Sequence, residues 1–352
     1  MVEYHPPPDS IGGRSTAPVA ILRTEPDAVK DDVMRAMDLA RWREFISPGA
    51  DIALKPNLGW DKLIPGAISA PWVVEAVILA IRDYVGSIYL VESDQVVVDV
   101  ERVFRLSRLD AVCRRYGVTW VNMSKGRFVR HKNTEHLVLH DVRIPEILTH
   151  TELITLPVMK THNKTILSGA LKNQWGCLET LRHNFHPVLS RALVDVNLLV
   201  QPRFAVMDGT VGLEGDGPKS GSPKEMDVIL ASGNLVGLDA TAAQLMGFNP
   251  ETIEHLQLCA KHGLGSMPGA FDLKGDPWQE LWSPFKPARH NAVSWLELAL
   301  RRSLFEWLIF KTPLLHLFAW GARRYYDFWD LWVGRRLRTA FFRNSRYADQ
   351  WR

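Results

Sequence analysis

The chain has 352 residues, of which 46% are hydrophobic and 23% are charged, so it can bury a sizeable core in one large or two ordinary domains. This composition excludes a disordered chain, and no stretch reaches the roughly 20 uncharged apolar residues that a membrane-spanning helix needs. The three cysteines, Cys113, Cys177 and Cys259, form no CxxC or CxxxC motif, so neither a cysteine-ligated zinc site nor an iron–sulfur cluster is expected. Their sparse, odd number indicates a reducing compartment.

The net charge of +3 hides an asymmetry between a body and a tail. Residues 288–352 hold eleven Arg and one Lys against two Glu and three Asp, a net charge of +7, together with six of the 13 Trp. The remaining residues therefore carry −4. We expect three parts: a disordered N-terminal arm at 1–16 without a signal-peptide pattern, a core at 17–287, and a Trp/Arg-rich helical tail at 288–352.

Short apolar runs and helical periodicities alternate along the body of the chain. Strands are predicted at 17–23, 51–57, 87–92, 118–122, 152–159, 203–208 and 227–232. Helices are predicted at 27–42, from 70 onward, and at 101–116, 187–200, 235–246 and 250–262. Residues 136–144 alternate imperfectly and predict a hairpin or an edge insertion. The pattern predicts an α/β fold with a mostly parallel, doubly wound sheet and a C-terminal amphipathic helical extension.

The most informative stretch begins as the apolar strand at 153–159 and then becomes polar. It delivers Lys160, His162 and Lys164, followed by Lys172 and Asn173 in a segment bounded by glycines. Strand ends of this kind build sites in α/β proteins, so we interpret the stretch as an anion-binding and catalytic loop. A basic surface loop is the alternative.

Other strand ends are expected to meet this loop at the same edge of the sheet. Lys55 and Asn57 follow the second strand, and with Lys160 and Lys172 they would create a positive field for a carboxylate or a phosphate. A lysine desolvated near other cations loses basicity, so one of these lysines is a candidate general base or covalent amine. His162 and His186 are the candidates for proton transfer.

Carboxylates follow a later strand, in a glycine-rich segment at 209–221 that matches neither of the common phosphate-binding motifs. We expect its glycines to form a sharp turn that lets Asp208, Glu214 and Asp216 face one point. These carboxylates would pair with lysines or contact substrate hydroxyls, or alternatively would hold a divalent cation such as Mg²⁺. Asp239 lies in an apolar helix and needs a partner, either in a neighbouring loop or at the site.

Several motifs together resemble the domain of unknown function 362 family over about residues 17 to 275. The motifs are Leu54-Lys-Pro-Asn57, Pro157-Val-Met-Lys-Thr-His162, Ser168-Gly-Ala-Leu-Lys-Asn173 with Gly176, His186, Val206-Met-Asp-Gly209, Glu214-Gly-Asp-Gly-Pro218, and Gly237-Leu-Asp-Ala240 with Leu245-Met-Gly247. The resemblance implies a shared set of site residues: Lys55, Asn57, Lys160, His162, Lys172, Asn173, His186, Asp208, Glu214 and Asp239. Many relatives carry a ferredoxin-like cysteine segment, which implies redox work; this chain lacks that segment.

The tail combines Trp, Tyr and Arg at helical spacing over 290–346, with Pro313 separating two amphipathic helices. This composition is typical of a helix that lies in the plane of a membrane surface. Packing on its own core or on another subunit, including a homo-oligomer, are the alternatives. Nucleic acid is not expected, since no groove-reading module is present.

We therefore expect a cytoplasmic enzyme, peripheral at the inner face of a membrane, that acts on a small or lipid-linked anionic substrate. The resemblance favours an oxidoreductase with an external electron donor. A non-redox lyase, isomerase or transferase is one alternative, and a non-catalytic membrane-surface binding module is the other. Lys160, His162, Lys172 and His186 are the predicted catalytic residues. The predicted substrate-binding residues are Lys55, Asn57, Lys164, Asn173, Asp208, Glu214 and Asp239.

Overall fold

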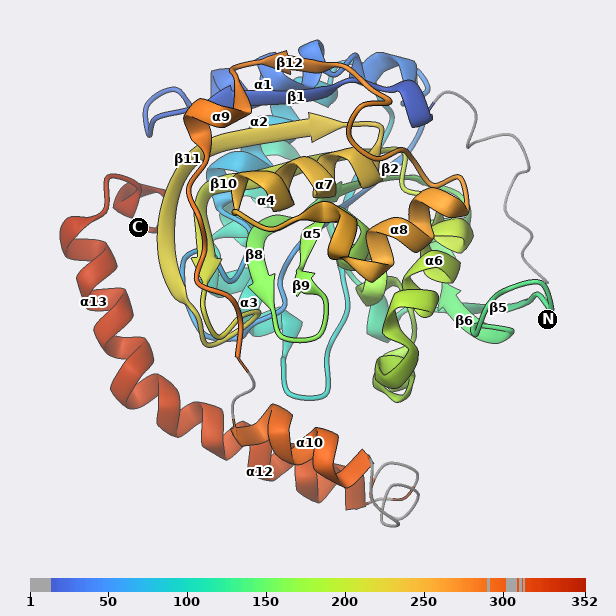
Figure 1. Cartoon of the computed structure of the whole chain (residues 1–352), viewed down its shortest axis with the longest axis vertical. Helices are drawn as coiled ribbons and strands as arrows, with labels where there is room; N and C mark the ends of the chain where they lie inside the picture. Colours follow the sequence, from blue (N-terminus) through green and yellow to red (C-terminus); the bar gives the residue numbers. More distant parts are fainter. Residues whose placement is uncertain (1–13, 290–291, 302–308, 310–311, 313) are drawn as a thin grey trace.

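A mostly parallel sheet forms the centre of the molecule, with strand order β12-β1-β11-β10-β7-β2-β3-β4 (Figure 1). The computed structural model describes residues 14–289, 292–301, 309, 312 and 314–352. The strands of the sheet are β1 (Val19–Arg23), β2 (Ile52–Pro56), β3 (Ile88–Glu92), β4 (Thr119–Asn122), β7 (Glu152–Leu156), β10 (Phe204–Glu214), β11 (Ser222–Ser232) and β12 (Leu273–Gly275). β11 runs antiparallel to both of its neighbours, β1 and β10.

Helices cover both faces of this sheet, as the predicted doubly wound fold requires. The helices of one face are α1 (Val29–Leu39), α2 (Pro71–Ile81), α3 (Val100–Leu106) and α4 (Leu109–Tyr116). Those of the other face are α5 (Gly169–Asn173), α6 (Leu189–Val200), α7 (Leu235–Leu245) and α8 (Glu254–Lys261), with the short α9 (Trp278–Leu281) nearby. Ile52 and Leu54 of β2 point into the first core and Ala53 into the other, so burial on both faces explains the continuous apolar strands.

The direction of winding reverses between β2 and β7. From β2 the chain proceeds outward through β3 to β4, whereas from β7 it proceeds in the opposite direction to β10. β2 and β7 pair in parallel from Ile52 opposite Glu152 to Pro56 opposite Leu156. Their carboxyl ends therefore flank a topological switch point, which is where open α/β sheets bind ligands.

Three predicted elements differ from the structure in instructive ways. The helix at 101–116 is divided because Arg108 adopts a left-handed φ of 63° between α3 and α4. The strand at 152–159 is divided at Pro157, after which β8 (Val158–His162) pairs with β10 and with β9 (Ile166–Leu167). The predicted hairpin is present, although its strands are β5 (Phe128–Lys132) and β6 (Asp141–Pro145), so it begins earlier than expected.

The prediction that residues 209–221 form a turn is wrong for 209–214, which continue β10. Here the glycines serve close packing between strands. A Cβ on Gly209 would lie 2.6 Å from Val228 of β11, and one on Gly212 would lie 2.8 Å from the carbonyl oxygen of Met159 in β8. Glycine inside a strand marks such a close approach.

The tail leaves the core and returns to it, forming an arc along one side of the molecule (Figure 1). It contains α10 (Ala292–Arg301), α12 (Leu314–Trp329), a π-helical turn at Asp330–Gly334, α13 (Arg335–Asn344) and a final 3-10 turn at Ala348–Trp351. Phe341, Tyr347 and Trp351 are buried in the core that also contains α2. Among the described helices, none is long and apolar enough to cross a membrane.

The predicted N-terminal arm lies almost entirely outside the described residues. Within the described part, Arg14–Thr16 form a 3-10 turn. The Ser15 carbonyl oxygen accepts hydrogen bonds from the side chains of Asn234 and Ser266.

Candidate functional site

A cavity of about 250 Å³ lies at the carboxyl ends of β2 and β3, beside β8 and α5. Eight residues that the sequence singles out line this cavity: Lys55, Asn57, Lys160, His162, Lys164, Lys172, Asn173 and His186. They come from segments more than 100 residues apart and meet because parallel strands present their ends at one edge of the sheet. Their individual roles stay predictions.

A buried ion pair forms the floor of the cavity. The Nζ atom of Lys55 donates to Oε2 of Glu92 at 2.8 Å, and both side chains are almost fully buried. The chain can approach this pair closely only because residue 176 is a glycine: a Cβ there would lie 2.6 Å from Glu92 Oε1 and 3.0 Å from Lys55 Nζ. Glu92 is not among the predicted site residues, although it ends the predicted strand at 87–92 and so occupies the same strand-end position as the polar residues that are.

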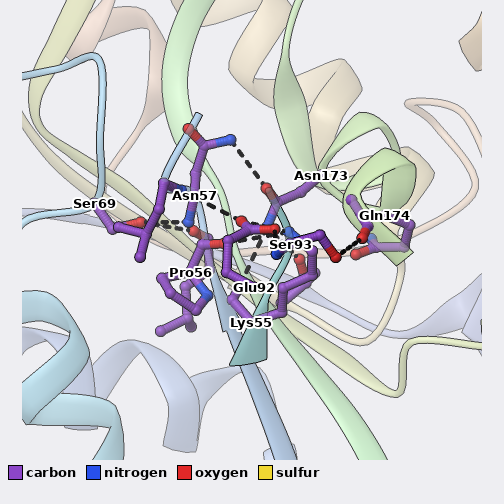
Figure 2. Close-up of polar contacts among 12 residues, drawn as sticks. Lys55, Pro56, Asn57, Ser69, Glu92, Ser93, Asn173 and Gln174 are labelled. Atoms are coloured by element: carbon purple, nitrogen blue, oxygen red, sulfur yellow. Dashed lines mark hydrogen bonds and ion pairs between the residues drawn. The ribbon is translucent and has the colours of Figure 1, made fainter. Parts of the chain in front are cut away.

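Two asparagines connect the ends of β2 and α5. Asn57 Nδ2 donates to Asn173 Oδ1 at 3.0 Å, and Asn173 Nδ2 donates to Thr155 Oγ1 at 2.8 Å and to the Lys55 carbonyl oxygen at 3.1 Å (Figure 2). The Asn57 backbone amide in turn donates to Ser69 Oγ at 2.8 Å. These bonds hold the side-chain oxygen of Asn57 in a fixed position.

That oxygen accepts a hydrogen bond from Lys160. The Lys160 Nζ atom donates to Asn57 Oδ1 at 2.6 Å and to the Ala67 carbonyl oxygen at 2.8 Å. Burial, together with the neighbouring cations Lys172 and Lys219, lowers the pKa of Lys160 to about 7. A neutral amine has two N–H groups and one lone pair. In neutral Lys160 these two oxygens accept both N–H groups, so the lone pair points elsewhere and can accept a proton.

Two further lysines face the cavity without a carboxylate at bonding distance among the described residues. Burial lowers the pKa of Lys172 to about 7, with Lys164 and Arg182 adding to the effect. Burial also lowers the pKa of Lys219, to about 8, although Asp61 opposes this shift. Lys219 follows Pro218 and lies 5.2 Å from the centre of the Trp60 ring, a cation–π distance. Lys219 is not among the site residues predicted from the sequence.

His162 has a defined tautomer because the backbone amide of Lys164 donates to its Nδ1 atom at 3.0 Å. An accepting Nδ1 carries no proton, so the proton of the neutral ring is on Nε2. Burial, followed by the cations Lys172 and Lys160, holds the pKa of His162 well below its ordinary value. His162 is thus a neutral hydrogen-bond donor at the cavity wall.

Helix α10 of the tail closes one side of the cavity through Glu297. Its carboxylate accepts from Lys164 Nζ at 3.0 Å and from Arg301 Nε at 3.0 Å, and lies 3.1 Å from His186 Nδ1. Arg301 also donates to the His183 carbonyl oxygen at 2.9 Å. Burial lowers the pKa of His186 to about 4, against the opposing effect of Glu297.

Helix α12 covers the cavity with apolar side chains. Phe318, Ala319, Ala322 and Tyr326 line it, and the Tyr326 ring packs edge-on against Trp60 at 4.9 Å between ring centres. Two ion pairs fasten the helix to the loop after β2: Lys62 to Asp327 at 2.6 Å and Arg323 to Asp61 at 3.2 Å. The tail therefore packs on its own core, which is one of the alternatives expected from its sequence. Its contribution to the cavity lining was not predicted.

Three predicted substrate-binding carboxylates lie outside the cavity lining, which corrects the expectation that they converge on it. Asp208 accepts from the Ala70 amide at 3.0 Å and from Thr210, so it orients the start of α2. Glu214 pairs with Lys286 at 3.2 Å and Lys224 at 3.7 Å instead of with the cavity lysines. Asp239 accepts from the amides of Ala170 and Leu171 and so caps α5, the helix that carries Lys172 and Asn173.

The divalent-cation alternative at Asp208, Glu214 and Asp216 finds no support in this arrangement. Asp208 is buried at the start of α2, Glu214 is paired at the far end of β10, and Asp216 is exposed. Within the described part of the chain, no three His, Cys, Asp or Glu side chains are grouped so that they would hold a metal ion.

The charge of the cavity wall is strongly positive. Seven basic side chains line the cavity, whereas its described lining includes only two carboxylates, Glu92 and Glu297. The basic residues are Lys55, Lys160, Lys164, Lys172, Lys219, Arg182 and Arg301. An anion that enters would be attracted by this excess and would satisfy cations that lack partners. The arrangement combines anion binding, a lysine lone pair and a histidine N–H donor within one covered space.

These features place the chain among the doubly wound α/β proteins, with a lysine-rich cavity at the switch point of the sheet. The profile of the family described as Domain of unknown function (DUF362) matches residues 52–244. This match covers more than half of the chain, so the chain belongs to the domain of unknown function 362 family. The matched region includes the cavity segments of β2, β8 and α5, whereas the covering tail lies beyond it.

Two individual proteins are also similar. The thylakoid-associated protein sll1697 of Synechocystis is 25% identical over 240 residues, covering 65% of this chain and 72% of that protein. The lactate racemase apoprotein from Thermoanaerobacterium thermosaccharolyticum is 11% identical, with a TM-score of 0.37, over 69% of this chain. The chain spans 59% of that structure, which is less than two thirds of its length.

Proposed function

We propose that this protein is an enzyme that binds a small anionic substrate under its tail and removes a proton from it with Lys160. The observation that carries the proposal is the environment of Lys160. Its pKa is about 7, and both N–H groups of its neutral form are accepted by fixed oxygens. A lone pair held in this way is suited to act as a general base near neutral pH.

In this proposal the other cavity residues have complementary tasks. Lys172 and Lys219, which have no carboxylate at bonding distance among the described residues, bind the carboxylate or phosphate of the substrate. His162 donates its Nε2 proton to the oxygen on which negative charge develops. Such a set supports proton transfer next to an acidic group, which is the chemistry of isomerases and lyases. Redox work with an external donor, implied by the family resemblance, stays a prediction that would use the same anion site.

The anion-binding half of the proposal is testable with inorganic phosphate by titration calorimetry. An anion favours protonated Lys172 and Lys219, so binding takes up protons, and affinity falls as pH rises through 7 to 8. Calorimetry in buffers of different ionisation enthalpy measures this uptake. We expect Lys172→Met combined with Lys219→Met to lose phosphate binding, whereas the exposed control Lys261→Met keeps it. Equal binding by all variants would contradict the proposal.

The catalytic half is tested by deuterium incorporation. The protein is incubated in deuterated water with a small-molecule extract of cells, and carboxylic acids and phosphate esters are examined by mass spectrometry. We expect deuterium to enter a specific compound with the unaltered chain and not with Lys160→Met, although that variant still binds phosphate. If the unaltered chain incorporates no more than Lys160→Met, the protein is an anion-binding module instead.

A further inference from the structure

Helix α12 and the turn after it are apolar on two opposite sides. The inner side packs on the core through Phe318, Ala322 and Tyr326. The outer side exposes large apolar residues to solvent: Leu317 is 64% exposed, Trp320 61%, Phe328 64%, Leu331 68% and Trp332 60%. A helix of a solitary soluble domain needs apolar residues only toward its core, so the outer side requires another explanation.

The outer residues form one continuous surface. Positions 317, 320, 324, 328 and 331 are three or four apart, which places them on one side of a helix. Arg324 interrupts the aromatic residues and is itself mostly exposed. Helix α10 lies beside α12 (Figure 1). Its residues Trp295 and Leu296 are also exposed.

Basic residues continue this surface along α13. Arg335, Arg336 and Arg343 are exposed and make no ion pair with any residue in the described ranges. A shallow groove is lined by Arg335, Arg338, Thr339, Phe342 and Arg343. A lipid surface has an apolar boundary beneath its anionic headgroups. The exposed aromatic residues of α12 match that boundary, and the arginines of α13 match the headgroups.

We propose that the outer side of α12 and α13 is a docking surface for an anionic lipid bilayer. Trp320, Phe328 and Trp332 enter the boundary between headgroups and acyl chains, and the α13 arginines bind lipid phosphates. A second copy of the chain fits this surface less well, because an isologous contact would meet the α13 arginines only with carboxylates that already have partners. Asp327 pairs with Lys62 and Arg324, and Asp330 pairs with Arg338. The reverse side of the docked helix is the roof of the cavity, so the bilayer lies directly outside the proposed active site.

The experiment is vesicle co-sedimentation of the full chain at low salt. Vesicles of phosphatidylcholine with phosphatidylglycerol are compared with vesicles of pure phosphatidylcholine. We expect binding to the anionic vesicles, and its loss when Trp320, Phe328 and Trp332 are all changed to serine. Arg335→Gln with Arg336→Gln should weaken binding about 30-fold, since each basic residue near an anionic surface contributes about 1 kcal/mol. Trp282→Ser is the matched control, because Trp282 is 53% exposed and follows α9, outside α10, α12 and α13.

Circular dichroism and thermal unfolding show whether the triple serine variant is folded. If it is not, the Arg335→Gln/Arg336→Gln variant provides the test alone. Binding of the unaltered chain to neither vesicle, or equal binding by all variants, overturns the proposal. So does a dimer in light scattering that the serine variant abolishes without any vesicle binding. Lys160→Met should sediment with anionic vesicles like the unaltered chain, so docking and the proposed catalysis can fail separately.

Discussion

At the scale of single residues, the site depends on lysines whose pKa is lowered by burial toward neutral pH. Lys160 and Lys172 have pKa values of about 7 in the folded chain, compared with 10.5 for an ordinary lysine. Between pH 7 and 10.5 the unfolded chain therefore binds more protons than the folded one. Stability must then rise as pH rises through this window, and it is lost as pH falls toward 7.

We expect most of this dependence to be lost when both lysines are removed, with a smaller part remaining because burial also lowers the pKa of Lys219, to about 8. The slope for each lysine is about 1 kcal/mol per pH unit. Urea unfolding of Lys160→Met/Lys172→Met should show a much smaller rise in the free energy of unfolding from pH 7 to pH 9 than the unaltered chain shows. The variant should also be more stable than the unaltered chain at pH 7. The exposed variant Lys261→Met should keep the original slope. A double variant that also keeps it would show that these lysines are charged in the folded state.

Gly176 is a second residue-scale determinant, because of the space it leaves around the Lys55–Glu92 pair. A methyl group there would lie 2.6 Å from Glu92 Oε1, and this part of the molecule is closely packed. We expect Gly176→Ala to cost about 1–3 kcal/mol of stability by chemical denaturation. Gly126→Ala is the control, because its nearest neighbour would be at 3.7 Å. Similar small losses in both variants would mean that the ion pair adjusts freely.

At the scale of elements, Glu297 couples the tail to the core. It joins Lys164, His186 and Arg301 from three different segments. We expect Glu297→Gln to loosen α12, because a neutral amide cannot compensate the buried cations. Hydrogen–deuterium exchange over residues 314–329 should become faster. Asp349→Asn, which removes only an exposed pair with Arg352, should leave that exchange unchanged. Unchanged exchange in Glu297→Gln would mean that the ion pairs of α12 itself hold the cover closed.

At the scale of the whole molecule, the last residues of the chain belong to the core. Trp351 is 3% exposed and packs in the same core as α1 and α2. We expect Trp351→Ala to lower the free energy of unfolding by about 3–5 kcal/mol in a single transition. The exposed Trp332→Ala should change it little in solution. The tail would fold independently of the sheet if Trp351→Ala lowered the free energy of unfolding no more than Trp332→Ala does. A separate early unfolding transition in Trp351→Ala would show the same.

Cytoplasmic location and oligomeric state also belong to this scale, and both stay predictions. The in-plane membrane helix expected from residues 290–346 falls partly on 290, 291, 302–308, 310, 311 and 313, which lie outside the described residues. The described part of the tail combines two of the expected alternatives: its inner side packs on the core, and its outer side is the proposed membrane surface.

The local periodicity of this sequence determines its strands, most of its helices and the polar residues at the strand ends, because these depend on neighbouring residues. That is why Lys55, Asn57, Lys160 and Lys172 are recognisable before any coordinates. Only the tertiary structure decides which distant groups join them. Lys219 and Glu297 reach the cavity through long-range packing. Asp208 and Asp239 accept hydrogen bonds from backbone amides at helix starts, which otherwise lack partners. Such contacts leave no periodic trace in the sequence.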